Sequence, residues 1–183
     1  MPRHLTALFA LLFTFIPLAA DAAEPVVRLS LVSEEATPET DTLNYFYLNQ
    51  EGEEQLEILN IHREPIVTDE DVEKASVDPS REGYIHITLT KAGAAKMREA
   101  TARMELGKDR MAVIVDGKVK TAPTVNAVLG NQFMISGLAD ETDAYILGIV
   151  SRLNHKTLSP WEVKQLEDRR LYPEKYVHDA PYT

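Results

Sequence analysis

The chain has 183 residues, enough for one domain with its own hydrophobic core and too few for two large domains. Hydrophobic residues make up 44% of it and charged residues 26%, which excludes a predominantly disordered chain. The net charge of −10 disfavours nucleic acid and anionic lipid as main partners, because an acidic surface repels phosphate. The sequence contains no cysteine, so disulfides, thiolate metal sites and a cysteine-linked lipid anchor are excluded.

The N-terminus predicts export. Arg3 and His4 precede a mostly apolar run over residues 5–18, and Ala20-Asp21-Ala22 then offers small residues at the spacing of a cleavage site. We therefore predict a signal peptide over residues 1–22 and a mature protein that is periplasmic or secreted and soluble, with no transmembrane segment. An uncleaved N-terminal anchor is the alternative.

The first part of the mature chain, residues 23–63, is predicted to consist of strands. Apolar and polar residues alternate over 26–32, residues 43–48 carry three consecutive aromatic residues, and a third alternating stretch covers 55–61. Thr68 followed three residues later by Asp71 resembles a capping box. This pattern predicts a short helix that ends before Pro79.

The middle of the chain alternates strand and helix signals. Residues 84–90 carry apolar side chains at every second position, and Thr90 is placed to cap a helix over 91–106. The continuous apolar run over 111–115 predicts a central strand. Asp116-Gly117 then predicts a two-residue hairpin turn, because glycine tolerates the positive φ that such a turn needs.

Further strands are predicted over 124–129 and 132–135, followed by a helix that Asp140 caps and that runs to Leu153. Ser159 and Pro160 predict a last helix, which belongs with a tyrosine-bearing tail to residues 158–183. This order predicts an α+β fold, with one mostly antiparallel sheet and helices packed on one face.

Four short segments resemble, in order, the head subdomain of the first periplasmic domain of SecD and SecDF, accessory proteins of protein export. They are Glu64 to Val72, Ile87 to Ala94, Ala112 to Val119 with Ala122-Pro123 after it, and Ile135 to Leu138. The likeness covers residues 64–153, within a predicted core of 64–157, and more weakly 26–61. It implies the α+β fold of that head, an exported location and contact with polypeptide.

The resemblance also singles out positions that are structural or contact a peptide: Asp116, Gly117, Lys118, Lys120, Pro123 and Gly137. Two departures limit what it implies. No transmembrane helix follows the signal, and Arg152-Leu153-Asn154-His155 stands where the family usually has Gly-x-Leu-Pro. The proton-driven motor function of whole family members is therefore not inferred.

No catalytic or metal-binding pattern is found. The histidines lack the spacing of a zinc site, which needs three or four convergent ligands, and the chain has no nucleophile elbow or phosphate loop. We predict no catalytic residues, no metal and no cofactor. Lys118 and Lys120 are expected on one face of a strand, either as a solvated edge or as contacts for an acidic or backbone-carbonyl ligand.

The predicted function is that of an exported, non-enzymatic accessory or binding module that contacts polypeptide or an envelope protein. Two alternatives stay open. One is a structural subunit of an envelope assembly, and the other is a hydrolytic enzyme built on the same fold, since a fold by itself does not determine function.

Overall fold

The computed structural model describes residues 24–155 and residue 164. The predicted last helix and the tail lie outside these residues, apart from Lys164, which is helical. The elements, in chain order, are β1 (Val27–Ser33), β2 (Thr40–Leu48), β3 (Glu54–His62), β4 (Val67–Thr68), η1 (Asp69–Asp71), β5 (Val72–Val77), β6 (Ile85–Leu89), α1 (Lys91–Ala102), β7 (Met111–Val115), β8 (Lys118–Thr121), β9 (Gln132–Ile135) and α2 (Asp143–Leu153).

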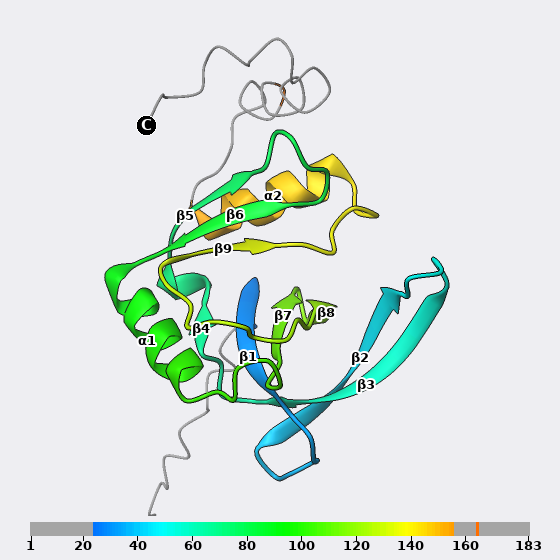
Figure 1. Cartoon of the computed structure of the whole chain (residues 1–183). Helices are drawn as coiled ribbons and strands as arrows, with labels where there is room; N and C mark the ends of the chain where they lie inside the picture. Colours follow the sequence, from blue (N-terminus) through cyan, green and yellow to red (C-terminus); the bar gives the residue numbers. More distant parts are fainter. Residues whose placement is uncertain (1–23, 156–163, 165–183) are drawn as a thin grey trace, which may run out of the picture.

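The strands form two antiparallel sheets. The larger sheet has the order β2-β3-β1-β7-β8, with β4 also paired to β1, and the smaller one has the order β5-β6-β9. Figure 1 shows α2 packed on the smaller sheet and α1 on the opposite side of the molecule from the β2–β3 hairpin. The predicted α+β class is confirmed, and its antiparallel strands divide between two sheets.

The main core lies where the two sheets and both helices meet. The predicted inward face of β6 is fully buried, with Ile85, Ile87 and Leu89 no more than 2% exposed. Met97 of α1 and the buried face of α2 from Ile146 to Leu153 join the same cluster. Burial of these side chains supplies most of the hydrophobic stabilisation, at about 25 cal/mol per Å² of apolar surface.

A smaller core lies on the other face of the larger sheet. Alternation along β7 sends Val113 and Val115 into the main core and Ala112 and Ile114 into the smaller one, which also contains Leu59 and Ile61 of β3. All five residues of β7 are therefore buried, which explains why the sequence there is continuously apolar.

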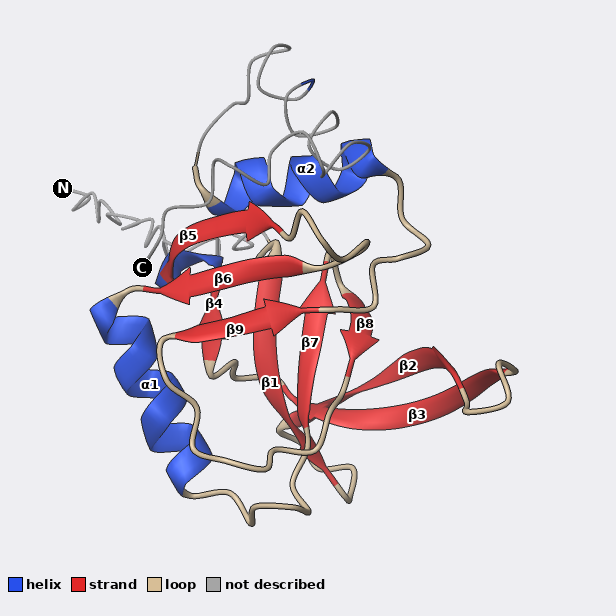
Figure 2. Ribbon diagram, turned by 45° about the horizontal axis from the view of Figure 1, so that its top comes forward, coloured by secondary structure: helices blue, strands red, loops and turns tan. Residues whose placement is uncertain are grey.

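The β2–β3 hairpin is a long two-stranded ribbon. Its pairing is continuous from Thr40↔His62 to Leu48↔Glu54, whereas β3 meets β1 only at Val32↔Ile61 and Ser33↔Asn60. The ribbon therefore extends away from the rest of the larger sheet (Figure 2). Both of its strands are longer than the predicted stretches.

Two predicted elements are wrong. The helix expected after Thr68 is one 3₁₀ turn, although the Thr68 N–H does donate to Asp71 Oδ2 at 3.2 Å, and residues 72–77 then pair with β6 as β5. The strand expected over 124–129 contributes only an isolated bridge between Arg110 and Thr124. At residues 72–77, backbone pairing with β6 overrides the local helix signal.

The helix boundaries also differ from those predicted. Helix α1 ends at Ala102 rather than Leu106, and α2 begins after Thr142, whose hydroxyl accepts the Tyr145 N–H, rather than after Asp140. The predicted cap of α1 is confirmed, because the Thr90 hydroxyl accepts the Gly93 N–H at 3.1 Å.

Candidate functional site

The Asp116-Gly117 turn joins β7 to β8 as predicted. Asp116 has φ +46° and Gly117 has φ +73°, the left-handed conformations that a two-residue hairpin turn requires. The Asp116 carboxylate accepts hydrogen bonds from both terminal nitrogens of Arg152, at 2.7 and 2.8 Å, and from the Tyr145 hydroxyl at 2.9 Å. The turn is thereby fixed to α2.

The electrostatics of this cluster follow from these contacts. The hydrogen bonds from Arg152 hold the pKa of Asp116 below its usual value and outweigh the opposing effect of burial. Burial, together with the Asp116 carboxylate, raises the pKa of Tyr145 to about 12. At neutral pH the cluster is therefore an ionised carboxylate that accepts from a protonated phenol and a guanidinium, which suits a structural anchor.

Lys118 and Lys120 lie in different environments. Lys118 is exposed, whereas the Lys120 side chain is only 11% exposed and its Nζ lies 2.5 Å from Glu141 Oε1. The Lys120 ammonium also lies 5.9 Å from the centre of the Tyr145 ring. The solvated-edge interpretation therefore fits Lys118 and is wrong for Lys120, which ties β8 to the loop before α2.

Gly137 brings that loop against β8. Its φ is +79°, and a Cβ at this position would come within 2.3 Å of the Lys120 carbonyl oxygen. Only glycine fits such a close approach at a positive φ. Pro123 lies apart from this group, because it follows the far end of β8 and its carbonyl accepts the Met111 N–H at 3.1 Å. Five of the six signature positions thus come together.

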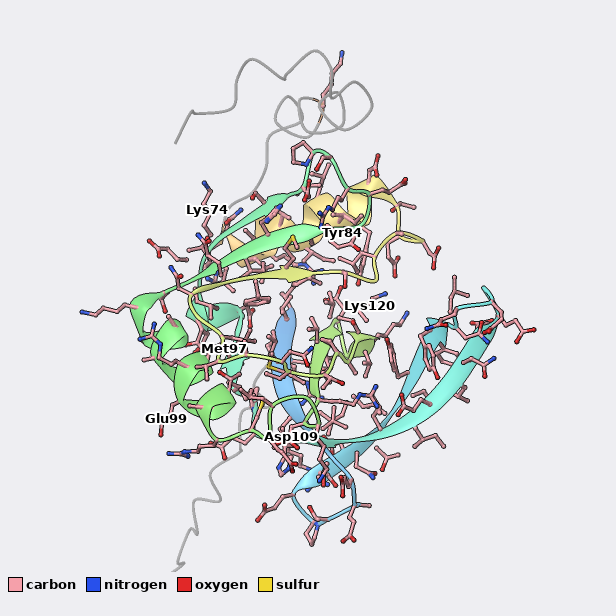
Figure 3. The ribbon with its side chains drawn as sticks, viewed as in Figure 1. Lys74, Tyr84, Met97, Glu99, Asp109 and Lys120 are labelled. Carbon is pink, nitrogen blue, oxygen red and sulfur yellow. The ribbon has the colours of Figure 1, made fainter. Side chains whose placement is uncertain are left out.

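A groove runs between this group and the β2–β3 ribbon. Its volume is about 550 Å³, and one wall is the stretch from Tyr45 to Leu48, while the other contains Lys120, Thr121, Ser136, Gly137, Ala139 and Asp140. An adjoining groove places Leu43, Asn44 and Phe46 opposite Gly117 to Lys120. Figure 3 shows Lys120 at β8, on the side of the molecule that carries the ribbon.

The groove follows the edge of β2. Successive residues of a strand point to opposite faces, so a groove that four consecutive residues line must run along the edge of the strand. Among the described residues, β2 and β8 are each paired to a neighbouring strand on one side only. The outer edge of β2 therefore has backbone donors and acceptors without a strand partner, although β8 lies close to it in space.

The aromatic wall was not among the residues predicted for a site. Tyr45 and Tyr47 stack with their ring centres 5.2 Å apart, and Phe46 between them is 56% exposed. Three consecutive aromatic residues in one strand cannot all face a single core, because alternate side chains point to opposite faces. That pattern was the available signal for an exposed aromatic surface.

The chemistry of the groove favours binding. Lys120 and Glu141 neutralise one another, and the rest of the lining combines aromatic and apolar side chains with polar and charged ones, among them Glu54, Lys118 and Asp140. In residues 24–155 and 164, no three His, Asp or Glu side chains are grouped so that they could hold a metal ion. Over the same residues, neither helix has both the length and the apolar character to cross a membrane.

Comparisons with known proteins agree on one family. The family model described as "SecDF, P1 head subdomain" matches residues 44–153. The protein translocase subunit SecDF of Thermus thermophilus is 35% identical over 91 residues, which are 48% of this chain and 12% of the relative. The protein translocase subunit SecD of Acidaminococcus fermentans is 31% identical over 121 residues, 64% of this chain and 28% of the relative.

Two solved structures are similar to the chain. One, described as the structure and function of a membrane component SecDF that enhances protein export, has a TM-score of 0.50 and 24% identity, and the match covers 73% of this chain and 64% of that one. The other, SecDF in a super-membrane-facing form, has a TM-score of 0.49 and 27% identity, with coverage of 73% and 19%. The similarity to the first structure, at 24% identity, is evidence for the fold alone.

Proposed function

The chain belongs to the SecDF P1 head subdomain family, and from this premise we propose that it is a non-enzymatic accessory module of protein export that binds extended polypeptide. The single observation that carries the proposal is the unpaired edge of β2 along a groove with one aromatic wall. An extended segment can add to such an edge, gaining affinity from backbone hydrogen bonds with little dependence on its sequence.

Several features of the groove support this proposal. Tyr45 and Tyr47 offer aromatic surface that accepts many kinds of side chain. The opposite wall is held in place by Gly137 against Lys120 and by the Lys120–Glu141 ion pair. Because this wall is already fixed, it loses little conformational entropy when a ligand binds. The flexible ligand is ordered on binding, and this costs about 1–2 kcal/mol of free energy per residue. We therefore expect micromolar or weaker affinity.

The cellular setting is part of the proposal. The chain spans 12% and 28% of the lengths of the two translocase subunits it matches, so the activity of those whole proteins is not carried over. We propose that the signal over residues 1–22 directs the chain to the periplasm, where it meets exported polypeptide or an envelope partner.

The test is an NMR titration of the isotope-labelled mature protein with an unfolded, export-competent polypeptide. We expect the largest shifts at residues 43–48, 117–121 and 136–140, and little change in α1. Ala139 is exposed and lines the groove, so Ala139→Arg should obstruct binding. Ala127, which is exposed in another loop and lines none of the described grooves, gives the matched control Ala127→Arg.

Binding by Ala127→Arg but not by Ala139→Arg would support the proposal. Absence of any shift at millimolar polypeptide, or equal binding by both variants, would contradict it.

A further inference from the structure

One face of the β2–β3 ribbon, here called the apolar face, exposes four large apolar side chains beside the polar Asn44 and Glu54. The cross-strand pairs Phe46↔Leu56 and Asn44↔Ile58 place these side chains on the same face, together with Leu48. Phe46, Leu48, Leu56 and Ile58 are between 54% and 66% exposed, the four highest values among the large apolar residues described as exposed. Such a contiguous patch marks an interaction surface.

The apolar face is continuous with the groove along the edge of β2. Phe46 and Leu48 belong to the apolar face and also line the groove. A strand added to β2 would extend the ribbon by one strand, so its alternate side chains would continue the two faces of the ribbon. Every second side chain of the added segment would then lie beside Phe46 or Leu48.

The two faces of the ribbon favour different side chains in the added strand. An apolar side chain beside Phe46 and Leu48 would bury apolar surface against them and thereby gain affinity. The intervening side chains would lie on the face of Tyr45 and Tyr47. The phenol hydroxyls of these two residues can pair with polar side chains there.

We propose that the groove selects extended segments whose apolar residues recur at every second position, the pattern of future β-strands, over segments of the same composition in another order. This inference rests on the proposed function and specifies its ligand class. Because backbone pairing is common to both kinds of segment, the difference in affinity comes from the side chains that lie beside Phe46 and Leu48.

The experiment compares two ten-residue peptides of identical composition, each with the same solubilising lysines at its ends. One alternates valine with serine or threonine, and the other carries the same residues with the valines at helical spacing. Dissociation constants are measured by NMR titration of the mature protein. We expect the alternating peptide to bind at least about tenfold more tightly, equivalent to about 1.4 kcal/mol.

Two double variants test whether the preference for the alternating peptide depends on the ribbon. Phe46→Ser with Leu48→Ser should abolish the difference between the peptides. The matched control, Leu106→Ser with Val128→Ser, changes two other exposed apolar residues and should preserve it. Circular dichroism of both double variants verifies that each is folded.

The possible failures are distinguishable. Equal binding of the two peptides in the groove would overturn the selection and leave the proposed function standing. A preference that survives in the ribbon variant would also overturn the selection. Concentration-dependent dimerisation that the ribbon variant removes would assign the face to a second copy of the chain and overturn it as well. Failure of both peptides, and of the unfolded polypeptide, would overturn the proposed function itself.

Discussion

The side-chain amide of Asn154 occupies the place of a strand partner for Ala75. Its Oδ1 accepts the Ala75 N–H at 2.8 Å, and its Nδ2 donates to the Ala75 carbonyl at 2.9 Å. Ala75 lies in β5, an outer strand of the smaller sheet, so Asn154 covers part of an edge that would otherwise be open. This contact joins the end of α2 to the sheet it covers.

Asn154→Ala should therefore lower the free energy of unfolding by about 1–3 kcal/mol, because it removes two hydrogen bonds from partly buried backbone groups. Urea denaturation of the mature protein measures the change. Asn126→Ala is the control, since Asn126 is exposed and makes only a 3.3 Å bond to a nearby carbonyl. Equal stability of the two variants would contradict the assigned role of Asn154.

Asp116→Asn tests the anchor of the turn. Asparagine keeps the shape and tolerates the positive φ, but it loses the charge that faces Arg152. We expect a loss of about 1 kcal/mol at pH 7, since hydrogen bonds to charged groups are strong but these side chains are partly exposed.

The pH dependence of this loss has a definite sign. The pKa of Asp116 is lowered in the folded state, so its contribution is complete above the unfolded pKa, near 4. The contribution disappears as the pH falls through the folded value. Denaturation curves of the wild type and the variant should therefore converge below about pH 4. A difference that stays constant down to pH 2 would show that the charge is not responsible.

Gly137→Ala should destabilise the protein by about 2–4 kcal/mol, because alanine is strained at positive φ and its Cβ would overlap the Lys120 carbonyl. Gly130 supplies the control, since a Cβ there meets nothing within 4 Å and its φ is not positive. Gly130→Ala should leave stability unchanged or raise it by up to about 1 kcal/mol. Thermal unfolding of both variants gives the comparison, and similar melting temperatures would contradict the close packing at Gly137.

Processing of the N-terminus provides a test of export. The pattern from Arg3 to Ala22 predicts cleavage after Ala22 or Ala23. Protein purified from its native host should therefore begin at Ala23 or Glu24 when sequenced from the N-terminus. Protein that retains Met1 and fractionates with the cytosol would contradict the prediction.

Local patterns in the sequence were sufficient for several parts of this fold. The period of two over residues 84–90 predicted the buried face of β6, and Thr90 predicted the N-terminal cap of α1. Asp116-Gly117 predicted the β7–β8 turn. These signals succeed because period and turn chemistry act over a few neighbouring residues. The four segments that resemble the SecDF head were likewise recognised from the sequence alone.

The tertiary structure decided what depends on partners far apart in the chain. Residues 72–77 are a strand because β6 pairs with them, and Lys120 is shielded because Glu141, 21 residues later, reaches its ammonium. The groove exists only because the free edge of β2 comes to face residues 136–140. No local periodicity in the sequence predicts these contacts. The free energy that stabilises them comes from backbone pairing and burial between segments that are distant in sequence.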